Sequence, residues 1–216
     1  MKFRNILICV YVLLVCMLDI GDDFEDYQKL KTENVSSIRM EDLPSEFSDE
    51  AFKTVDEFIK KTRNLDYEFI VYFDYVSGEI LKCAKGIKNN VKITFDDGEF
   101  EGHHVVSIHN HTKDSYSPPS DRNFGVLIRD FEDYELVASV KELLILKSKG
   151  INILFHLFLK EYARSILKSC QNDCDEKYSD SEKANDICDI MYGIALSNYI
   201  NDKNIKGIQL TRMGYD

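Results

Sequence analysis

The 216-residue chain lacks an excess of basic residues, with 27 lysines and arginines against 38 aspartates and glutamates and a formal net charge of −11. Without that excess it cannot displace the counterions of phosphates, so no nucleic acid is expected as a partner. The acidic balance favours solubility and basic partners instead. The chain also lacks internal repeats and low-complexity composition, and 44% of its residues are hydrophobic. That is enough for the core of one domain.

The apolar run near the N-terminus is shorter than the roughly 20 residues of a comfortable membrane span. It covers residues 6–18, follows Lys2 and Arg4 and precedes acidic residues, which is the charge pattern of a signal peptide or signal anchor. No small-x-small cleavage site follows. We interpret residues 1–20 as such a segment, with membrane association through residues 6–18, and favour a membrane-anchored or exported protein over a cytoplasmic one. The alternatives are a buried N-terminal strand or helix, or an extension from a misassigned start.

Three cysteines cluster near the C-terminus. Cys170 and Cys174 are four residues apart and would share a helix face, and Cys188 follows. A disulfide and half of a metal site are open alternatives. Because no histidine lies nearby in the sequence, we interpret the three residues as ordinary thiols.

The pattern of elements predicts an α/β domain over residues 48–216 with a C-terminal helical extension, preceded by an acidic, irregular connection at 21–47. Ser48 can cap a helix with an acidic first turn and apolar residues at helical spacing. Residues 64–86 predict a hairpin with its turn at 77–79. Other strands are predicted at 91–100, 103–111, 134–140, 142–149 and 205–212, and helices at 121–133, at the end of 151–171 and at 180–201. This order predicts a mixed β-sheet flanked by helices.

His109 and His111 end the strand predicted at residues 103–111. Alternate side chains of a strand point to the same face, so both imidazoles point the same way. Two neutral imidazoles so placed can bind one zinc ion. On these two residues alone, ordinary surface histidines are the favoured alternative.

The loop that follows brings in a third side chain. Ser120, after a Ser-Pro-Pro turn, is placed as the N-cap of a helix, and Asn123 is then its third residue. Asn123 lies nearly one turn from the cap and can face the same site. The alternative interpretations are that Ser120 is only a helix cap and that Asn123 is an ordinary polar residue of the first turn. Together with the histidines, they predict a three-ligand metal site with room for a water.

These residues resemble the JAMM (JAB/MPN-type) metalloprotease superfamily, including its RadC-like members, over roughly residues 50–160. The matching segments are "HNH" at 109–111, "SDRN" at 120–123, where the family has Ser-x-x-Asp, and an upstream glutamate, Glu68, in "YEFIVYFDYVSGEIL". The resemblance implies a JAB/MPN-like (cytidine-deaminase-like) architecture. It also implies a zinc-dependent hydrolase of peptide or isopeptide bonds, acting on a protein or peptide.

The resemblance also implies roles for the matching residues. His109, His111 and Asn123 would hold zinc together with a water, whose pKa the metal lowers. Glu68 would act as general base and later protonate the leaving amine. Ser120 would hydrogen-bond the oxyanion. Taken singly, Glu68 is better interpreted as an exposed strand carboxylate, which is common in so acidic a chain.

Asn123 departs from the family, which has a metal-binding aspartate at this position. An amide oxygen carries no negative charge and binds zinc more weakly. Asp121 is about 200° away from Asn123 around a helix and should face elsewhere, whereas Asp114 in the loop is a reserve ligand. The loop between His111 and Ser120 is also about one residue longer than usual.

Two functions therefore stay open. The first is a zinc-dependent (iso)peptidase. The second is a catalytically silent JAMM-like domain that binds or scaffolds proteins. A zinc deaminase is disfavoured because no Cys-x-x-Cys follows the histidines. The acidic stretch at residues 129–137 is interpreted as a solvated connection, the alternative being a groove for a basic peptide.

Overall fold

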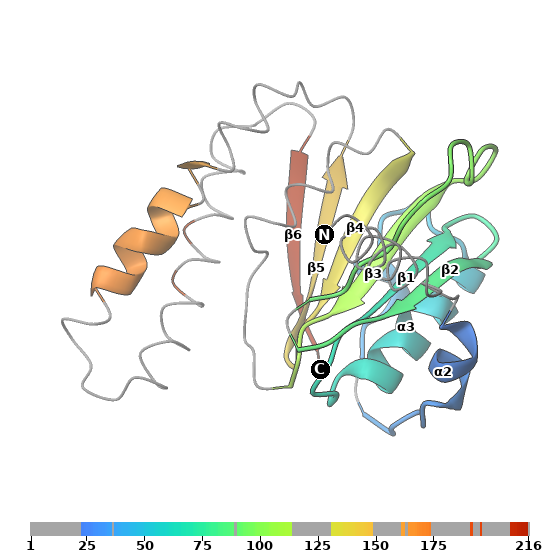
Figure 1. The fold of residues 1–216 in the computed structure, drawn as a ribbon, viewed down its shortest axis with the longest axis horizontal. Helices are drawn as coiled ribbons and strands as arrows, with labels where there is room; N and C mark the ends of the chain where they lie inside the picture. The colour runs from blue at the N-terminus through green and yellow to red at the C-terminus, as the bar shows by residue number, and fades with distance from the viewer. Residues whose placement is uncertain are drawn as a thin grey trace, which may run out of the picture.

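The protein has an α/β fold built on one six-stranded mixed sheet (Figure 1). The computed structural model describes residues 23–35, 37–88, 90–113, 131–148, 161–162, 164–173 and 208–215, with Met191 and Ala195. The interpretation of residues 1–20, the start of the helix expected at 121–133 and nearly all of the helix expected at 180–201 lie outside the described residues. Within those residues, no helix has the length and apolar character needed to cross a membrane.

The strand order of the sheet is β2-β1-β3-β4-β5-β6. All neighbouring strands are antiparallel except β3 and β4, which are parallel. The strands are β1 (Phe69–Asp74), β2 (Ile80–Lys85), β3 (Val105–Asn110), β4 (Glu132–Ala138), β5 (Glu142–Ser148) and β6 (Ile208–Gly214).

The predicted hairpin is confirmed as β1 and β2. Asp74 holds its turn, because the carboxylate accepts hydrogen bonds from the backbone N–H groups of Val76 at 2.8 Å and Ser77 at 3.0 Å. The strands predicted at 103–111, 134–140, 142–149 and 205–212 are confirmed as β3 to β6. β4 begins at Glu132, within the range where the sequence predicted a helix.

The strand predicted at residues 91–100 is wrong. Residues 91–96 have no regular structure and residues 97–102 form turns. Val91, Ile93 and Phe95 alternate with polar residues because they pack onto one face of the sheet, against the buried Phe100 and its neighbours. A strand paired within the sheet would show the same alternation. The pattern alone therefore does not distinguish a paired strand from an irregular segment that packs over the sheet.

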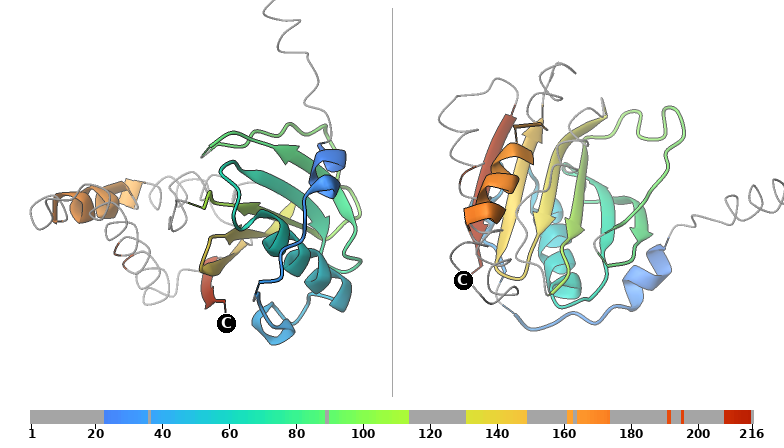
Figure 2. Two further views of the ribbon diagram at one scale, coloured as in Figure 1. Left: turned by 90° about the horizontal axis from the view of Figure 1, so that it is seen from below. Right: turned by 60° about the vertical axis from the view of Figure 1, so that its left-hand side comes forward.

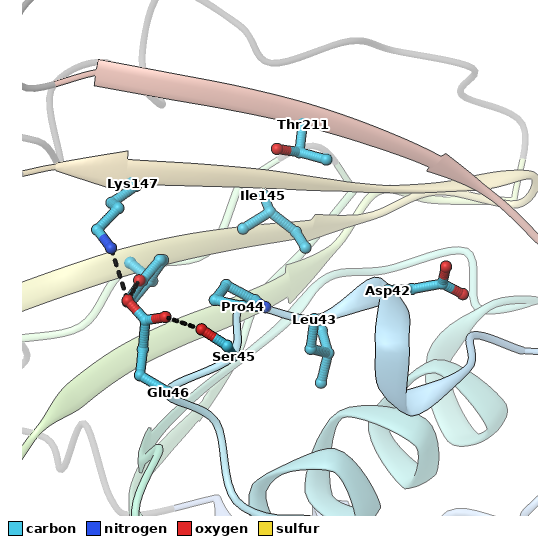
Figure 3. Close-up of a pocket in the computed structure, with 9 residues that line it drawn as sticks. Asp42, Leu43, Pro44, Ser45, Glu46, Ile145, Lys147 and Thr211 are labelled. Atoms are coloured by element: carbon cyan, nitrogen blue, oxygen red, sulfur yellow. Dashed lines mark hydrogen bonds and ion pairs between the residues drawn. The ribbon is translucent and has the colours of Figure 1, made fainter.

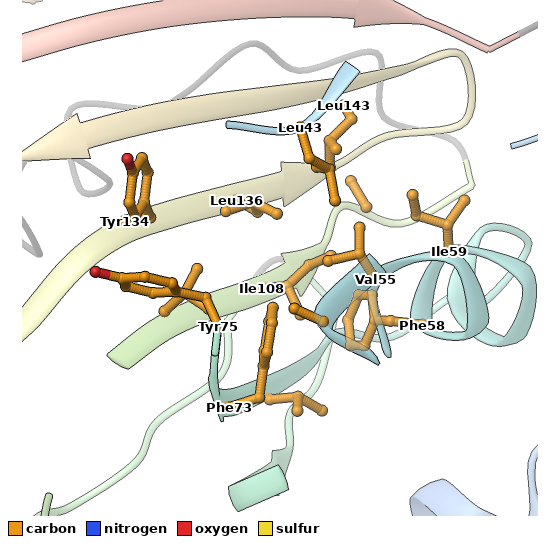
Figure 4. Packing of buried hydrophobic residues seen from close by; sticks show 14 of the residues in the cluster. Leu43, Val55, Phe58, Ile59, Phe73, Tyr75, Ile108, Tyr134, Leu136 and Leu143 are labelled. Carbon is orange, nitrogen blue, oxygen red and sulfur yellow. The ribbon is translucent and has the colours of Figure 1, made fainter. Parts of the chain in front are cut away.

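Helix α3 (Asp49–Thr62) covers one face of the sheet, as Figures 1 and 2 show. Its predicted cap is confirmed, since the Ser48 hydroxyl oxygen accepts a hydrogen bond from the backbone N–H of Ala51 at 3.1 Å. Val55, Phe58 and Ile59 are fully buried against the strands (Figure 4). The strand residues in this core are Phe69, Val71, Phe73, Val106, Ile108, Leu136, Leu143 and Ile145, among others.

Residues 23–47 are more regular than the sequence predicted. They contain α2 (Phe24–Lys29) and the 3-10 helix η1 (Met40–Asp42). Tyr27 and Phe47 of this segment are buried in the core shared with α3. The connection is therefore part of the domain, because its aromatic side chains complete the layer that covers the sheet.

Gly78, in the hairpin turn, lies against the start of α3. Its φ is +75°, and a Cβ there would stand 2.6 Å from the carbonyl carbon of Glu50. We expect Gly78→Ala to lower the free energy of unfolding by about 2–4 kcal/mol, combining backbone strain with a clash against the helix. Urea unfolding followed by circular dichroism measures the loss. Gly102→Ala is the matched control, because Gly102 has φ +86° with no atom within 4 Å. Equal losses in the two variants would contradict the clash.

Candidate functional site

The face of the sheet opposite α3, called the second face below, carries the predicted histidine strand. Ile70 of β1 pairs with His109 of β3, and Tyr72 with Ser107. Paired residues of antiparallel strands project to the same side, so these four side chains share the second face. Phe100 packs against it. The described part of this face thus combines apolar side chains, such as Ile70 and Tyr72, with the polar Ser107 and His109.

His109 and His111 lie side by side, as strand alternation predicted. Their ring centroids are 5.3 Å apart with a 50° angle between the planes. Two imidazoles on one tetrahedral zinc, with zinc–nitrogen distances of about 2.0–2.1 Å, have centroids about 5 Å apart. The observed spacing therefore suits two ligands of a single ion. Both residues are buried, at 7% and 8% exposure, so the interpretation as surface histidines is wrong.

Burial is the main influence on the charge of His109. It lowers the pKa of His109 to about 3, and the neighbouring His111 acts in the same direction. The imidazole is therefore neutral at pH 7. A neutral imidazole has a lone pair available to a metal, so the environment suits a ligand.

Glu68 directly precedes β1 and is 8% exposed. It extends the ladder with β2, since its carbonyl oxygen accepts a hydrogen bond from the Gly86 N–H at 2.7 Å. Two residues before Ile70, its side chain belongs to the second face by strand alternation. Continuing the pairing of β1 with β3 places it opposite His111. The alternative of an exposed strand carboxylate is therefore wrong.

Asn110, between the two histidines, was not singled out from the sequence. It projects to the α3 side and is fully buried. Its amide oxygen accepts from the Phe69 N–H at 2.7 Å, and its amide nitrogen donates to the carbonyl oxygens of Tyr67 at 3.0 Å and Thr62 at 3.5 Å. It ties the ends of α3, β1 and β3 together and so sets the position of Glu68 relative to the histidines. The only signal in the sequence was a polar residue at a core-facing position.

Two buried carboxyl groups of β4 were also missed, because residues 129–137 were interpreted as a solvated connection. Glu135 is 2% exposed, and its Oε1 lies 3.6 Å from Nδ1 of His109. Glu132 is 6% exposed and accepts a hydrogen bond from the hydroxyl of Ser107. The interpretation is wrong for residues 132–137, because they belong to β4, an inner strand of the sheet.

The rest of the predicted site is not covered by the structure. Ser120 and Asn123 lie outside the described residues, as do the reserve ligand Asp114 and the rejected Asp121. Within the described residues, no group of three or more His, Cys, Asp or Glu side chains could hold a metal ion. An asparagine is not among those side chains, so zinc binding through Asn123 stays a prediction.

Figure 3 shows a cavity of about 320 Å³. Its lining residues Tyr134 and Ile145 belong to the core packed against α3, so it lies on the side of the sheet opposite the histidines. Its charged groups bind one another, since Lys147 Nζ is 2.6 Å from Oε1 of Glu46 and the Tyr134 hydroxyl donates to the same carboxylate. Lys147 and Tyr134 lower the pKa of Glu46 to about 2. The lining is Asp42, Leu43, Pro44, Ser45, Glu46, Tyr134, Ile145, Lys147 and Thr211. Because Glu46, Lys147 and Tyr134 bind one another on the other side of the sheet, we assign this cavity no role in the histidine site.

A second cavity, of about 340 Å³, lies beside the start of β3 and combines aromatic rings with carboxylates. Phe95, Phe100 and Phe131 pack against one another with centroids 5.0–5.6 Å apart. The acidic side chains in its lining are Asp96, Glu99, Glu101 and Asp133. Aromatic faces and carboxylates both attract cations.

Comparison with known proteins adds no identification. No protein-family model, no curated protein and no solved structure matches the chain.

Proposed function

We propose that the protein is a zinc-dependent hydrolase of JAB/MPN-like (cytidine-deaminase-like) architecture that cleaves a peptide or isopeptide bond. One observation carries the proposal: His109 and His111 are buried side by side with ring centroids 5.3 Å apart. Glu68, also buried, directly precedes β1, the strand that pairs with β3. Two neutral imidazoles at this spacing suit one shared divalent cation. A carboxylate close to them is the kind of group that acts as general base toward a metal-bound water.

The proposed roles follow from the chemistry of each side chain. His109 and His111 bind the metal through neutral imidazoles, with Asn123 as a third, uncharged ligand. Zinc, when bound, supplies a Lewis acid and lowers the pKa of water. The carboxylate of Glu68 accepts a proton from the attacking water and later donates it to the leaving amine. Ser120 donates a hydrogen bond to the oxyanion of the attacked carbonyl.

We propose a basic protein or peptide as the substrate or partner. The net charge of −11 supports this, as does the cavity lined by three phenylalanines and by Asp96, Glu101 and Asp133. Its fourth carboxylate, Glu99, is paired with Lys82. We also propose that residues 1–20 direct the protein to a membrane or to export. Cell fractionation of the full chain and of a chain that starts at residue 21 tests this targeting role. Equal solubility of the two proteins would contradict it.

A catalytically silent domain used for protein binding or scaffolding is the second candidate. Asn123 favours it, because an amide oxygen holds zinc more weakly than a carboxylate. A binding module needs no metal, whereas the hydrolase must retain zinc with two imidazoles and an amide.

Zinc content measured by mass spectrometry on the full-length protein separates the two candidates. For the hydrolase we expect one zinc per chain in the wild type, none in His109→Ala and one in Glu68→Gln, which keeps the ligands. His104→Ala is the matched control, because His104 is exposed, and should keep zinc.

The silent domain predicts a different result. The wild type would carry no zinc, and Asn123→Asp would gain one equivalent. Asp121→Asn tests the orientation argument, since loss of zinc in that variant would make Asp121 the third ligand. Absence of zinc from both the wild type and Asn123→Asp would contradict the proposed metal site altogether.

A further inference from the structure

Glu135 is a buried carboxyl group to which the proposed reaction assigns no role. It lies in β4 opposite Ser107 of β3, and both side chains project to the second face. It is 2% exposed, and its Oε1 is 3.6 Å from Nδ1 of His109, too long for a hydrogen bond but within the range of an ion pair. Both groups are buried, so the carboxyl group of Glu135 acts on the His109 ring with little screening by water.

The contact is directed at one nitrogen of the ring. An imidazole that binds a metal is neutral and keeps one N–H, on either Nδ1 or Nε2. A carboxyl oxygen this close to Nδ1 favours the tautomer with the hydrogen on Nδ1, because the N–H dipole then points toward the oxygen. The lone pair is left on Nε2. Partners of this kind fix ring orientation and increase the basicity of the ligating nitrogen.

Glu132, the other buried carboxyl group of β4, has a different partner. Glu132 is 6% exposed, and the hydroxyl of Ser107 donates a hydrogen bond to it. It therefore differs from Glu135 in its partner, while both are buried glutamates of β4. This makes Glu132 a matched control for the loss of a buried charge.

We infer that Glu135 is a positioning residue for His109: its carboxyl group holds the hydrogen on Nδ1 and leaves Nε2 to ligate a divalent cation. The inference rests on the proposed function for the metal, but the tautomer of His109 is a property of the metal-free protein. The two can therefore fail separately.

The first test uses the wild-type protein without metal. Nitrogen-15 NMR of labelled histidines at pH 7.5 distinguishes a protonated from an unprotonated ring nitrogen, and His109→Ala assigns the signals. We expect His109 to be protonated on Nδ1. Protonation on Nε2 would overturn the inference, whatever the protein does with zinc.

The second test measures zinc affinity by competition with a chelating dye. We expect Glu135→Leu to weaken zinc binding about 10–100-fold, with His109 divided between both tautomers. Glu135→Gln, which can present its carbonyl oxygen at the same place, should keep the Nδ1–H tautomer and most of the affinity. Glu132→Gln should change neither.

The outcomes separate the inference from the proposed function. Suppose that the wild type binds no zinc, and that His109 carries its hydrogen on Nδ1 in the wild type and in Glu135→Gln but not in Glu135→Leu. The proposed metal site is then wrong, whereas the role of Glu135 in positioning His109 is supported. If Glu135→Leu and the matched variant Glu132→Leu weaken zinc binding equally, the effect is structural and the inference fails. Should Glu135→Leu not fold, Glu135→Gln and the wild-type tautomer still decide.

Discussion

Phe58→Ala is expected to lower the free energy of unfolding by about 3–5 kcal/mol, the range for removing a buried aromatic ring. Phe58 is fully buried in the middle of α3. Its ring stacks on Tyr27 of α2 at a centroid distance of 6.0 Å, and Tyr27 in turn meets Phe69 of β1 at 6.0 Å. Truncation therefore leaves a cavity where both helices contact the sheet. The loss is a large share of the 5–15 kcal/mol typical of a domain.

Urea unfolding followed by circular dichroism and tyrosine fluorescence measures this change, since the chain has no tryptophan. Phe58→Leu should lose less, because it keeps most of the apolar volume. Val76→Ala is the surface control: Val76 is 52% exposed, and its truncation should change the free energy by less than about 0.5 kcal/mol. A Phe58→Ala loss as small as that of Val76→Ala would contradict the packing of α3 on the sheet.

Acid is expected to destabilise the metal-free protein through His109. The pKa of this residue is about 3 in the folded state, against an ordinary value of 6.5. Below pH 6.5 the unfolded chain binds a proton that the folded chain excludes, so the contribution is complete above pH 6.5 and is lost as the pH falls toward 3. The slope is about 1.4 kcal/mol per pH unit, and between pH 6.5 and 4.5 the loss is about 2–3 kcal/mol.

Unfolding free energies of two proteins, one with His109 and one with His109→Leu, measured from pH 7.5 to 4.5 with a chelator present, isolate this effect. Carboxylates with lowered pKa values that lie away from His109, such as Glu46, are common to both proteins and cancel in the difference. Both proteins carry Glu135→Gln, because this carboxyl group lies 3.6 Å from the His109 ring and would not cancel. We expect the protein with His109 to lose the extra about 2–3 kcal/mol and the His109→Leu protein to lack that loss. Parallel curves for the two proteins would contradict a buried, neutral His109.

Local patterns predicted several elements of the fold correctly. Ser48 and the helical spacing up to Ile59 predicted α3, because a cap and an apolar stripe depend on residues within a few positions of each other. The orientation of His109 and His111 also followed from strand alternation alone. Neither feature depends on which other element packs against the helix or the strand.

The failures share one physical reason. Residues 91–96 alternate like a strand but lie over the second face, and the acidic residues 132 and 135 are in the interior of the sheet. Alternation and acidity describe a segment, whereas pairing and burial depend on segments far away in the chain.

The sequence by itself determined the helix after Ser48, the hairpin, the later strands and the shared direction of the two imidazoles, since all of these follow from local periodicity. Only the tertiary structure decided that β3 runs parallel to β4. That pairing places Glu135 beside His109 and removes both side chains from water. No local pattern contains this information, because the two residues meet through the pairing of strands joined by a long connection.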